Sequence, residues 1–213
     1  FSRGRSVSCN TAVASVGMHI GADALRAQAS TFGFGDSLSV PMRVTPSTIP
    51  AELNMPQLAQ SSIGQFDVRV TPLQMAMVAA GVANDGAVMK PYLVQSVIGS
   101  DLSVIETTDP QELSQAVTPD VAAQLTRMME AVVTDGSGTR AQIDGVAVAG
   151  KSGTAQHGEG RKPHAWFISF APADDPQIAV AVIAEDGGTT GSEIGGGRVA
   201  APIARQMMEA RLK

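Results

Sequence analysis

Two segments of the chain combine an apolar pattern of helical spacing with a clear helix start. Segment 71–84 opens with threonine and proline, and Gln74, three residues after the threonine, completes the pattern of a capping box. Segment 118–134 opens with the same threonine–proline pair and ends before an aspartate–glycine pair. Mixed helical spacings predict one or two helices over 10–29, and a last helix is expected from about 199 to 212.

Apolar runs of strand length are concentrated in the second half of the chain. Regions 164–170 and 177–184 are typical of buried strands, and the short connection between them favours antiparallel pairing. A third strand is expected over 146–154, and shorter strands over 88–98 and 103–107. Because helices come first and strands follow, the order predicts an α+β fold rather than an alternating α/β fold.

A long segment without clear periodicity, from about 31 to 70, lies between the first helices and segment 71–84. Gly33, Gly35 and four prolines interrupt it, so it is expected to be irregular. An irregular stretch of this kind inside a compact domain is usually functional or a lid. A glycine-rich loop is expected over 187–197, just before the last helix.

Composition narrows the class of protein. The 213 residues carry a net charge of −5, with 44% apolar and 16% charged residues, which fits a globular chain rather than a disordered one. The acidic balance and the 4% aromatic content argue against nucleic acid as a partner. Cys9 is the single cysteine, which excludes an internal disulfide and a multi-cysteine zinc site. No metal or cofactor is expected.

The start of the chain and its apolar runs bear on cellular context. The chain begins with Phe1 rather than methionine and has no signal-peptide pattern. Its longest apolar run, 178–184, is far shorter than the roughly 20 residues that span a bilayer. The chain is therefore expected to be a piece of a longer protein, with any export or anchoring signal upstream.

One stretch matches a nucleotide-binding motif letter for letter. Residues 145–152 have the G-x4-G-K-S spacing of a phosphate-binding loop. Such a loop follows a buried strand and opens a helix. Here the Val–Ala alternation favours a strand, and the residues after Ser152 are rich in glycine and lack a helical period. Nucleotide binding is therefore only a remote alternative.

Two other motifs indicate acyl transfer. Ser8-Cys9-Asn10 has the form Ser-x-Asn, and Lys151-Ser152-Gly153 has the form Lys-Ser/Thr-Gly. They are two of the three signatures of serine acyltransferases that react with β-lactams. With further blocks in the same order, nearly the whole chain resembles class B penicillin-binding proteins, most of all the actinobacterial cell-division or elongation transpeptidases. These blocks are Ile63-Gly64-Gln65, the runs 71–76 and 83–86, Lys90-Pro91, Ala165-Trp166-Phe167, Ala171-Pro172 and the run 200–203.

The third signature, Ser-x-x-Lys, is missing. The chain has four lysines, at 90, 151, 162 and 213, and the residues three positions before them are Ala87, Val148, Glu159 and Ala210. The resemblance therefore implies that residues 1–213 are the C-terminal portion of a transpeptidase domain. The nucleophilic serine would lie outside this chain, which on its own should not acylate.

The resemblance implies catalytic roles for three residues. Ser8 would relay a proton between the lysine of the missing motif and the leaving nitrogen. Asn10 would hydrogen-bond the acyl amide of the substrate and help to fix that lysine. Lys151 would place a positive charge near Ser8 and the substrate carboxylate. Without the family blocks, Ser8 and Asn10 would be ascribed to a helix cap, and Lys151 to a solvated strand end.

The resemblance implies substrate binding for the next three residues. The hydroxyls of Ser152 and Thr154 would bind the terminal carboxylate, and the Thr154 backbone N–H would be half of an oxyanion hole. Gly153 would leave room for a substrate that lies antiparallel along the strand. The other half of the oxyanion hole would belong to the absent serine.

The implied fold is the penicillin-binding or β-lactamase-like fold, a mostly antiparallel sheet covered by helices with a helical subdomain. The implied enzyme is a serine-type D,D-transpeptidase that cross-links peptidoglycan stem peptides ending in D-Ala-D-Ala and is inhibited by β-lactam antibiotics. Its expected partners are those peptides, the missing N-terminal segment and a lipid-II glycosyltransferase. The expected location is the extracytoplasmic face of the cytoplasmic membrane, in the cell envelope, with an upstream helix as anchor.

Several alternatives stay open. A β-lactamase or a β-lactam sensor shares these motifs, although the chain shows no convincing Glu-x-x-x-Asn loop for a deacylating water. The missing nucleophile also allows a non-catalytic scaffold in the division machinery. His157 and His164 flank a glycine-rich turn, which is either solvated or a rim contact to substrate, and Trp166 is expected in the core.

Overall fold

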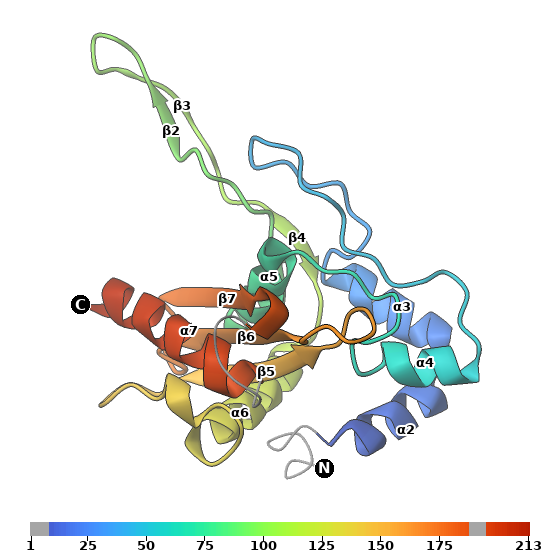
Figure 1. The fold of residues 1–213 in the computed structure, drawn as a ribbon. Coiled ribbons are helices and arrows are strands. Elements are labelled where there is room, and N and C mark those ends of the chain that lie inside the picture. The colour runs from blue at the N-terminus through green and yellow to red at the C-terminus, as the bar shows by residue number, and fades with distance from the viewer. Residues whose placement is uncertain (1–8, 188–194) are drawn as a thin grey trace.

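The computed structural model describes residues 9–187 and 195–213 (Figure 1). Its centre is a three-stranded antiparallel sheet in the order β5 (Ala149–Ala155), β6 (His164–Ala171) and β7 (Ile178–Ala184). The pairings of β5 with β6 and of β6 with β7 run without a register shift. This confirms the two strands predicted over 164–170 and 177–184 and their antiparallel pairing.

Helices cover both faces of this sheet. α7 (Gly196–Leu212) packs on one face, where Phe167, Val180 and Met208 belong to one buried cluster. α5 (Pro72–Ala83) and α6 (Pro119–Thr134) lie on the other face, where Val82, Met129 and Phe170 form a second cluster. Phe167 and Phe170 both lie on β6 and point to opposite faces because side chains alternate along a strand.

Two of the helix predictions are confirmed closely, because both rest on local capping chemistry. α6 begins after Thr118, whose side chain accepts a hydrogen bond from the Val121 N–H. α5 begins after Thr71, whose Oγ1 accepts from the Gln74 N–H at 3.1 Å. The expected capping box is only half formed, because the Gln74 side chain is buried and donates to the Phe32 carbonyl instead.

The N-terminal part is helical, as predicted, and consists of two helices. α2 (Asn10–Ile20) and α3 (Ala22–Thr31) are separated by Gly21, which has a φ of 87°. The prediction of an irregular segment over 31–70 is wrong in part, because α4 (Met55–Ser61) lies within it. A capping box between Asn54 and Gln57 starts α4, and this local signal was present in the sequence.

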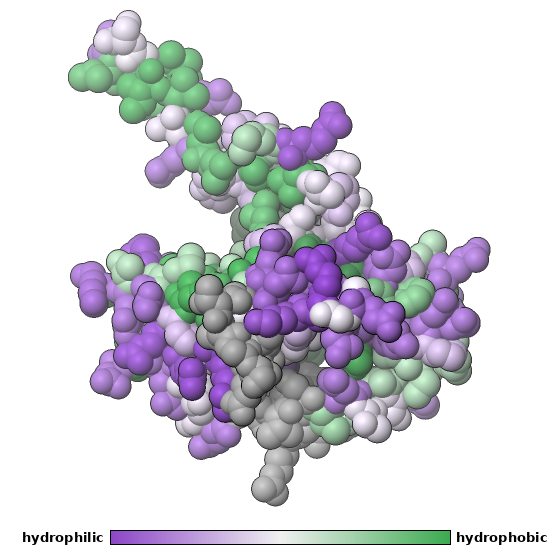
Figure 2. Space-filling model, viewed as in Figure 1, coloured by the Kyte–Doolittle hydropathy of each residue, from purple (hydrophilic) through white to green (hydrophobic). Residues whose placement is uncertain are grey.

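A thin β arm projects away from the main body (Figures 1 and 2). The segment expected as one strand over 88–98 is divided into β1 (Ala87–Met89) and β2 (Ser96–Ile98). β2 pairs with β3 (Val104–Thr107) in the arm, and β1 pairs at its base with β4 (Glu112–Gln115), which was not predicted. The arm exposes large apolar side chains, among them Leu102 and Ile105.

Two boundaries near the sheet differ from prediction. β5 begins at Ala149 rather than at residue 146 and ends at Ala155, and Lys151-Ser152-Gly153 lies within it, as in the predicted strand. α7 begins at Gly196 rather than near 199. Of the loop expected over 187–197, residues 188–194 lie outside the described part of the chain.

Candidate active site

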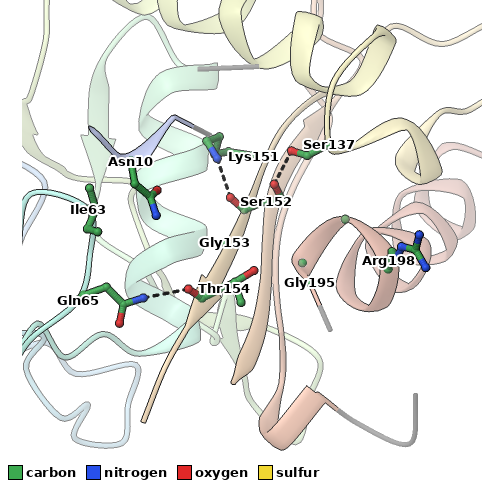
Figure 3. A pocket seen from close by; sticks show the side chains of 12 residues that line it. Asn10, Ile63, Gln65, Ser137, Lys151, Ser152, Gly153, Thr154, Gly195 and Arg198 are labelled. Atoms are coloured by element: carbon green, nitrogen blue, oxygen red, sulfur yellow. Dashed lines mark hydrogen bonds between the residues drawn. The ribbon is translucent and has the colours of Figure 1, made fainter. Parts of the chain in front are cut away.

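A pocket of about 590 Å³ runs along the free edge of β5 (Figure 3). β5 is at the edge of its sheet, because β6 pairs with it on one side and no described strand pairs on the other. The lining residues come from five separate parts of the chain. They are Asn10, Ile63, Gln65, Ser137, Lys151, Ser152, Gly153, Thr154, Gly195, Gly196, Gly197 and Arg198.

The fold brings five of the six predicted site residues together. Asn10 is the first residue of α2, and Lys151 to Thr154 lie consecutively on β5. Ser8, the remaining predicted residue, lies outside the described residues. Because neighbouring side chains on a strand point to opposite faces, the lining must wrap around the β5 edge to include all four β5 residues.

Lys151 is the central cation of the pocket. Its Nζ donates a hydrogen bond to the Ser152 carbonyl oxygen at 2.7 Å. Burial lowers the pKa of this ammonium below the ordinary lysine value of 10.5, because a buried charge is poorly solvated. Lys151 is therefore partly buried in the pocket rather than a solvated strand end, which is how it would be interpreted without the family blocks.

Two hydrogen bonds link β5 to neighbouring loops. The hydroxyls of Ser137 and Ser152 are 2.6 Å apart, and Ser137 follows α6 in the chain. The Gln65 side-chain amide donates to the Thr154 carbonyl oxygen at 3.0 Å. Ser137 was not singled out in the sequence, because its proximity to Ser152 arises from tertiary packing alone. Gln65 was noted in the sequence only as part of the Ile63-Gly64-Gln65 block that carries the family resemblance.

Glycines bring the start of α7 close to the sheet. A Cβ on Gly196 would lie 1.9 Å from the Trp166 carbonyl oxygen and 2.6 Å from the Gly153 carbonyl oxygen. A Cβ on Gly197 would lie 1.7 Å from the Ser137 carbonyl oxygen. Only glycine fits both positions, and the N-terminus of α7 consequently lies beside Ser152 and Thr154. The partial positive charge of a helix N-terminus favours a negatively charged ligand there.

The electrostatic character of the pocket differs from that of the whole chain. Among the described lining residues, Lys151 and Arg198 are basic and none is acidic, although the chain carries a net charge of −5. The Arg198 guanidinium points away from β5 in Figure 3, so Lys151 is the cation nearest to the strand. The hydroxyls and the α7 N-terminus complete a lining suited to a carboxylate.

A second cavity of about 530 Å³ adjoins the first and is mostly apolar. It lies among α2, α5, α6 and β5, and Val78, Leu125 and Met128 contribute to its wall. Asn10, Lys151 and Ser152 line both cavities. The polar pocket therefore opens directly onto an apolar space of considerable size.

His157 and His164 are not simply a solvated turn. Their rings stack with centroids 3.5 Å apart, and His157 Nε2 lies 2.9 Å from Asp186 Oδ1. Arg161 pairs with the other Asp186 oxygen at 2.8 Å, and this hydrogen bond is the main cause that lowers the pKa of the Asp186 carboxyl. The two imidazoles and the carboxylate come within 4.8 Å of one another. Nearly parallel rings do not allow one metal ion to lie in both ring planes.

Trp166 is half-buried and not fully in the core. It lies with both histidines along a further cavity of about 660 Å³, which also includes Lys151 and Thr154. The expectation that Trp166 lies in the core is therefore only partly met, because one side of it lines this cavity.

The lowered pKa of Lys151 gives a pH dependence of definite sign. Between the folded-state pKa and 10.5, the unfolded chain binds more protons than the folded chain, so stability rises with pH. We expect the stability of the wild-type protein relative to Lys151→Met to increase between about pH 7 and about pH 10. Urea unfolding of both proteins measures this difference. A difference that stays constant over the same range would contradict the burial of the ammonium.

The sheet, the covering helices and the pocket define the class of protein. The chain belongs to the penicillin binding protein transpeptidase domain family, which matches residues 3–209. This confirms the resemblance that the motifs indicated and the α+β transpeptidase fold. The nucleotide-binding alternative is wrong, because Lys151 and Ser152 lie within β5, which continues into an antiparallel hairpin instead of a helix.

The relatives include particular transpeptidases of actinobacteria. The chain is 48% identical to the peptidoglycan D,D-transpeptidase PbpA of Mycolicibacterium smegmatis, over 97% of this chain and 42% of that protein. It is 45% identical to PbpA of Mycobacterium tuberculosis H37Rv over the same shares. The chain thus spans less than half the length of these curated relatives.

Solved structures agree with this relationship. The crystal structure of PBPA from M. tuberculosis matches with a TM-score of 0.93 and 42% identity, over 100% of this chain and 51% of that chain. Its penicillin G acyl-enzyme complex matches with a TM-score of 0.91 and 44% identity, over 100% of this chain and 48% of that chain.

No described helix of the present chain is long and apolar enough to cross a membrane.

Proposed function

We propose that residues 1–213 are the C-terminal portion of a transpeptidase domain. In this proposal the chain supplies the substrate-binding side of a serine D,D-transpeptidase site. The observation that carries the proposal is the pocket in which Asn10, Lys151, Ser152 and Thr154 line the free edge of β5. The relatives support it, because they are named peptidoglycan D,D-transpeptidases and one is solved as a penicillin G acyl-enzyme.

The proposed substrate is a stem peptide that ends in D-Ala-D-Ala. An extended peptide can pair with the open edge of a strand through backbone hydrogen bonds. Its terminal carboxylate would accept from the hydroxyls of Ser152 and Thr154, beside the Lys151 ammonium and the N-terminus of α7. A lining with two basic residues and no acidic one among the described residues suits that charge.

The chemistry proceeds in two acyl transfers. The nucleophilic serine, carried by a segment outside this chain, attacks the carbonyl carbon of the penultimate D-alanine, and its proton passes to a base. The C–N bond of the terminal residue breaks, and the leaving D-alanine takes up a proton. An amine of a second stem peptide then attacks the acyl-serine ester, forms a new amide and releases the serine.

The residues of this chain assist in stated ways. The Thr154 N–H would stabilise the oxyanion that forms at the attacked carbonyl. Asn10, at the start of α2, would hold the acyl amide and the lysine of the missing motif. Ser8 would carry the proton to the leaving nitrogen, and Lys151 would favour that transfer through its charge. β-Lactams would acylate the same serine and persist as esters.

The apolar cavity beside the pocket is the proposed seat of the missing segment. It shares Asn10, Lys151 and Ser152 with the polar pocket, so a helix that fills it would present a serine to the β5 edge. Its apolar walls suit a buried helix of the same domain. An upstream helix that anchors the protein at the extracytoplasmic face, and a lipid-II glycosyltransferase partner, complete the proposal at the level of the whole protein.

Labelled penicillin G and intact mass measurement under denaturing conditions test this function. The full polypeptide that contains Ser-x-x-Lys should gain one long-lived penicilloyl group, and the 213-residue chain alone should gain none. Rapid loss of the adduct with turnover of penicillin would instead indicate a β-lactamase. Absence of an adduct on the full polypeptide would favour the non-catalytic scaffold and contradict the proposal.

A further inference from the structure

We propose that Gln65 is a gate on the β5 edge, whose side-chain amide holds the Thr154 carbonyl until a ligand N–H replaces it. This inference rests on the proposed function. It concerns which ligands enter the site easily, and it assigns Gln65 a role in specificity rather than in the chemical step.

The inference begins with the backbone of the edge strand. The Ser152 and Thr154 carbonyls are two residues apart, and carbonyls with this spacing point to the same side of a strand. Both accept side-chain donors: the Lys151 Nζ at 2.7 Å and the Gln65 Nε2 at 3.0 Å. The acceptors that an added peptide strand would use are thus already occupied (Figure 3).

Side chains that cap an edge strand in this way prevent unwanted pairing. Open strand edges tend to pair with any extended chain, and proteins commonly protect them. Lys151 reaches back to its own strand, whereas Gln65 reaches across the pocket from another element. The Gln65 contact is therefore the one that a ligand must displace from outside β5.

The backbone at Gln65 is held while its side chain is accessible. Gln65 follows α4, and its N–H donates to the Gln60 carbonyl at 3.0 Å. Gly64, with a φ of 77°, makes the turn that directs the chain back toward the sheet. Only the side chain has to rotate for the Thr154 carbonyl to become available. One solvent-exposed hydrogen bond of this kind changes an equilibrium by about fivefold.

Gln65 is expected to distinguish ligands by whether they carry an N–H that donates to the Thr154 carbonyl. Penicillin G carries an acylamido N–H, which can donate to the Thr154 carbonyl and competes there with the Gln65 amide. Imipenem lacks an acylamido side chain and has no need of the Thr154 carbonyl. Removal of the Gln65 donor should therefore raise the rate of acylation by penicillin G relative to the rate of acylation by imipenem.

Two substitutions in the full polypeptide test this inference. Gln65→Met keeps the length of the side chain and removes the donor, and Gln65→Ala removes both. We expect each to raise the acylation rate constant for penicillin G by about fivefold, with little change for imipenem. Gln177→Ala is the matched control, because the Gln177 amide also donates to a backbone carbonyl, at 3.3 Å in a turn outside the pocket lining.

The outcomes separate the gate from the proposed function. If neither β-lactam acylates the wild-type protein, the proposed function fails. If both acylate it and the Gln65 variants leave the ratio of the two rate constants unchanged, the gate is wrong and the function stands. A selective slowing of penicillin G would mean that Gln65 contributes to binding, which also overturns the gate. Melting temperatures of the variants establish that they are folded.

Discussion

Replacement of Lys151 by alanine in the full polypeptide is expected to lower the rate of acylation by penicillin G by about 100-fold to 1000-fold. This is the usual effect of the removal of one group that stabilises the developing charge. Lys151 is the cation nearest to the β5 strand in the pocket, and its Nζ also holds the Ser152 carbonyl. Stopped-flow or quenched mass measurement of the acyl-enzyme gives the rate constant.

Lys162→Ala is the matched control for this prediction. Lys162 is exposed in the β5–β6 turn and is not part of the pocket lining, so its removal should leave acylation within about twofold of wild type. If Lys151→Ala reacts as fast as Lys162→Ala, the positive charge at the β5 edge has no part in the reaction. The assignment of Lys151 would then be wrong.

Gly196→Ala should cause a large loss of stability. The added Cβ would meet the carbonyls of Trp166 and Gly153, and backbone atoms cannot move aside cheaply. Overpacking of this type costs about 3 kcal/mol, which corresponds to a melting temperature about 6 to 12 °C lower. Thermal unfolding followed by circular dichroism measures the change.

Gly195→Ala provides the comparison at the neighbouring position. A Cβ there would lie 3.8 Å from Thr154 Oγ1, an ordinary contact, and the φ of −167° suits any residue. Its melting temperature should stay within about 1 °C of wild type. Equal effects of the two substitutions would mean that α7 does not approach the sheet as closely as the structure has it.

Local signals explain which parts of the fold could be predicted. α6 and the start of α5 follow threonine–proline caps, β7 is a continuous apolar run, and β6 is a mostly apolar run of suitable length. These features act within a few residues along the chain. α4 has an equally local signal, the Asn54–Gln57 capping box, which the prolines around it obscured.

The remaining features depend on tertiary contacts. The early start of α7 at Gly196 follows from close packing on the backbone of β5 and β6, and a glycine-rich sequence does not by itself indicate a helix. The Gln74 side chain does not complete the capping box and donates instead to the Phe32 carbonyl, 42 residues away in the chain. No local pattern could indicate that partner.

The residues of the candidate site likewise fall into two groups, those that short motifs indicate and those that only tertiary packing brings in. Lys151 to Thr154 and Asn10 were singled out through their short motifs, and the fold brings them together. The pocket is completed by Ser137, Gly196 and Gly197. They reach it only because α6 ends beside β5 and α7 begins beside β5. The catalytic and binding roles stay predictions, and the placement of Ser8 lies outside the described residues.

A crystal structure of the full polypeptide acylated by penicillin G tests the central claim most directly. We expect the penicillin carboxylate to accept hydrogen bonds from the hydroxyls of Ser152 and Thr154, with the Lys151 ammonium nearby and the acylated serine at the mouth of the apolar cavity. An acyl group that extends away from the β5 edge, with its carboxylate in solvent, would contradict the account.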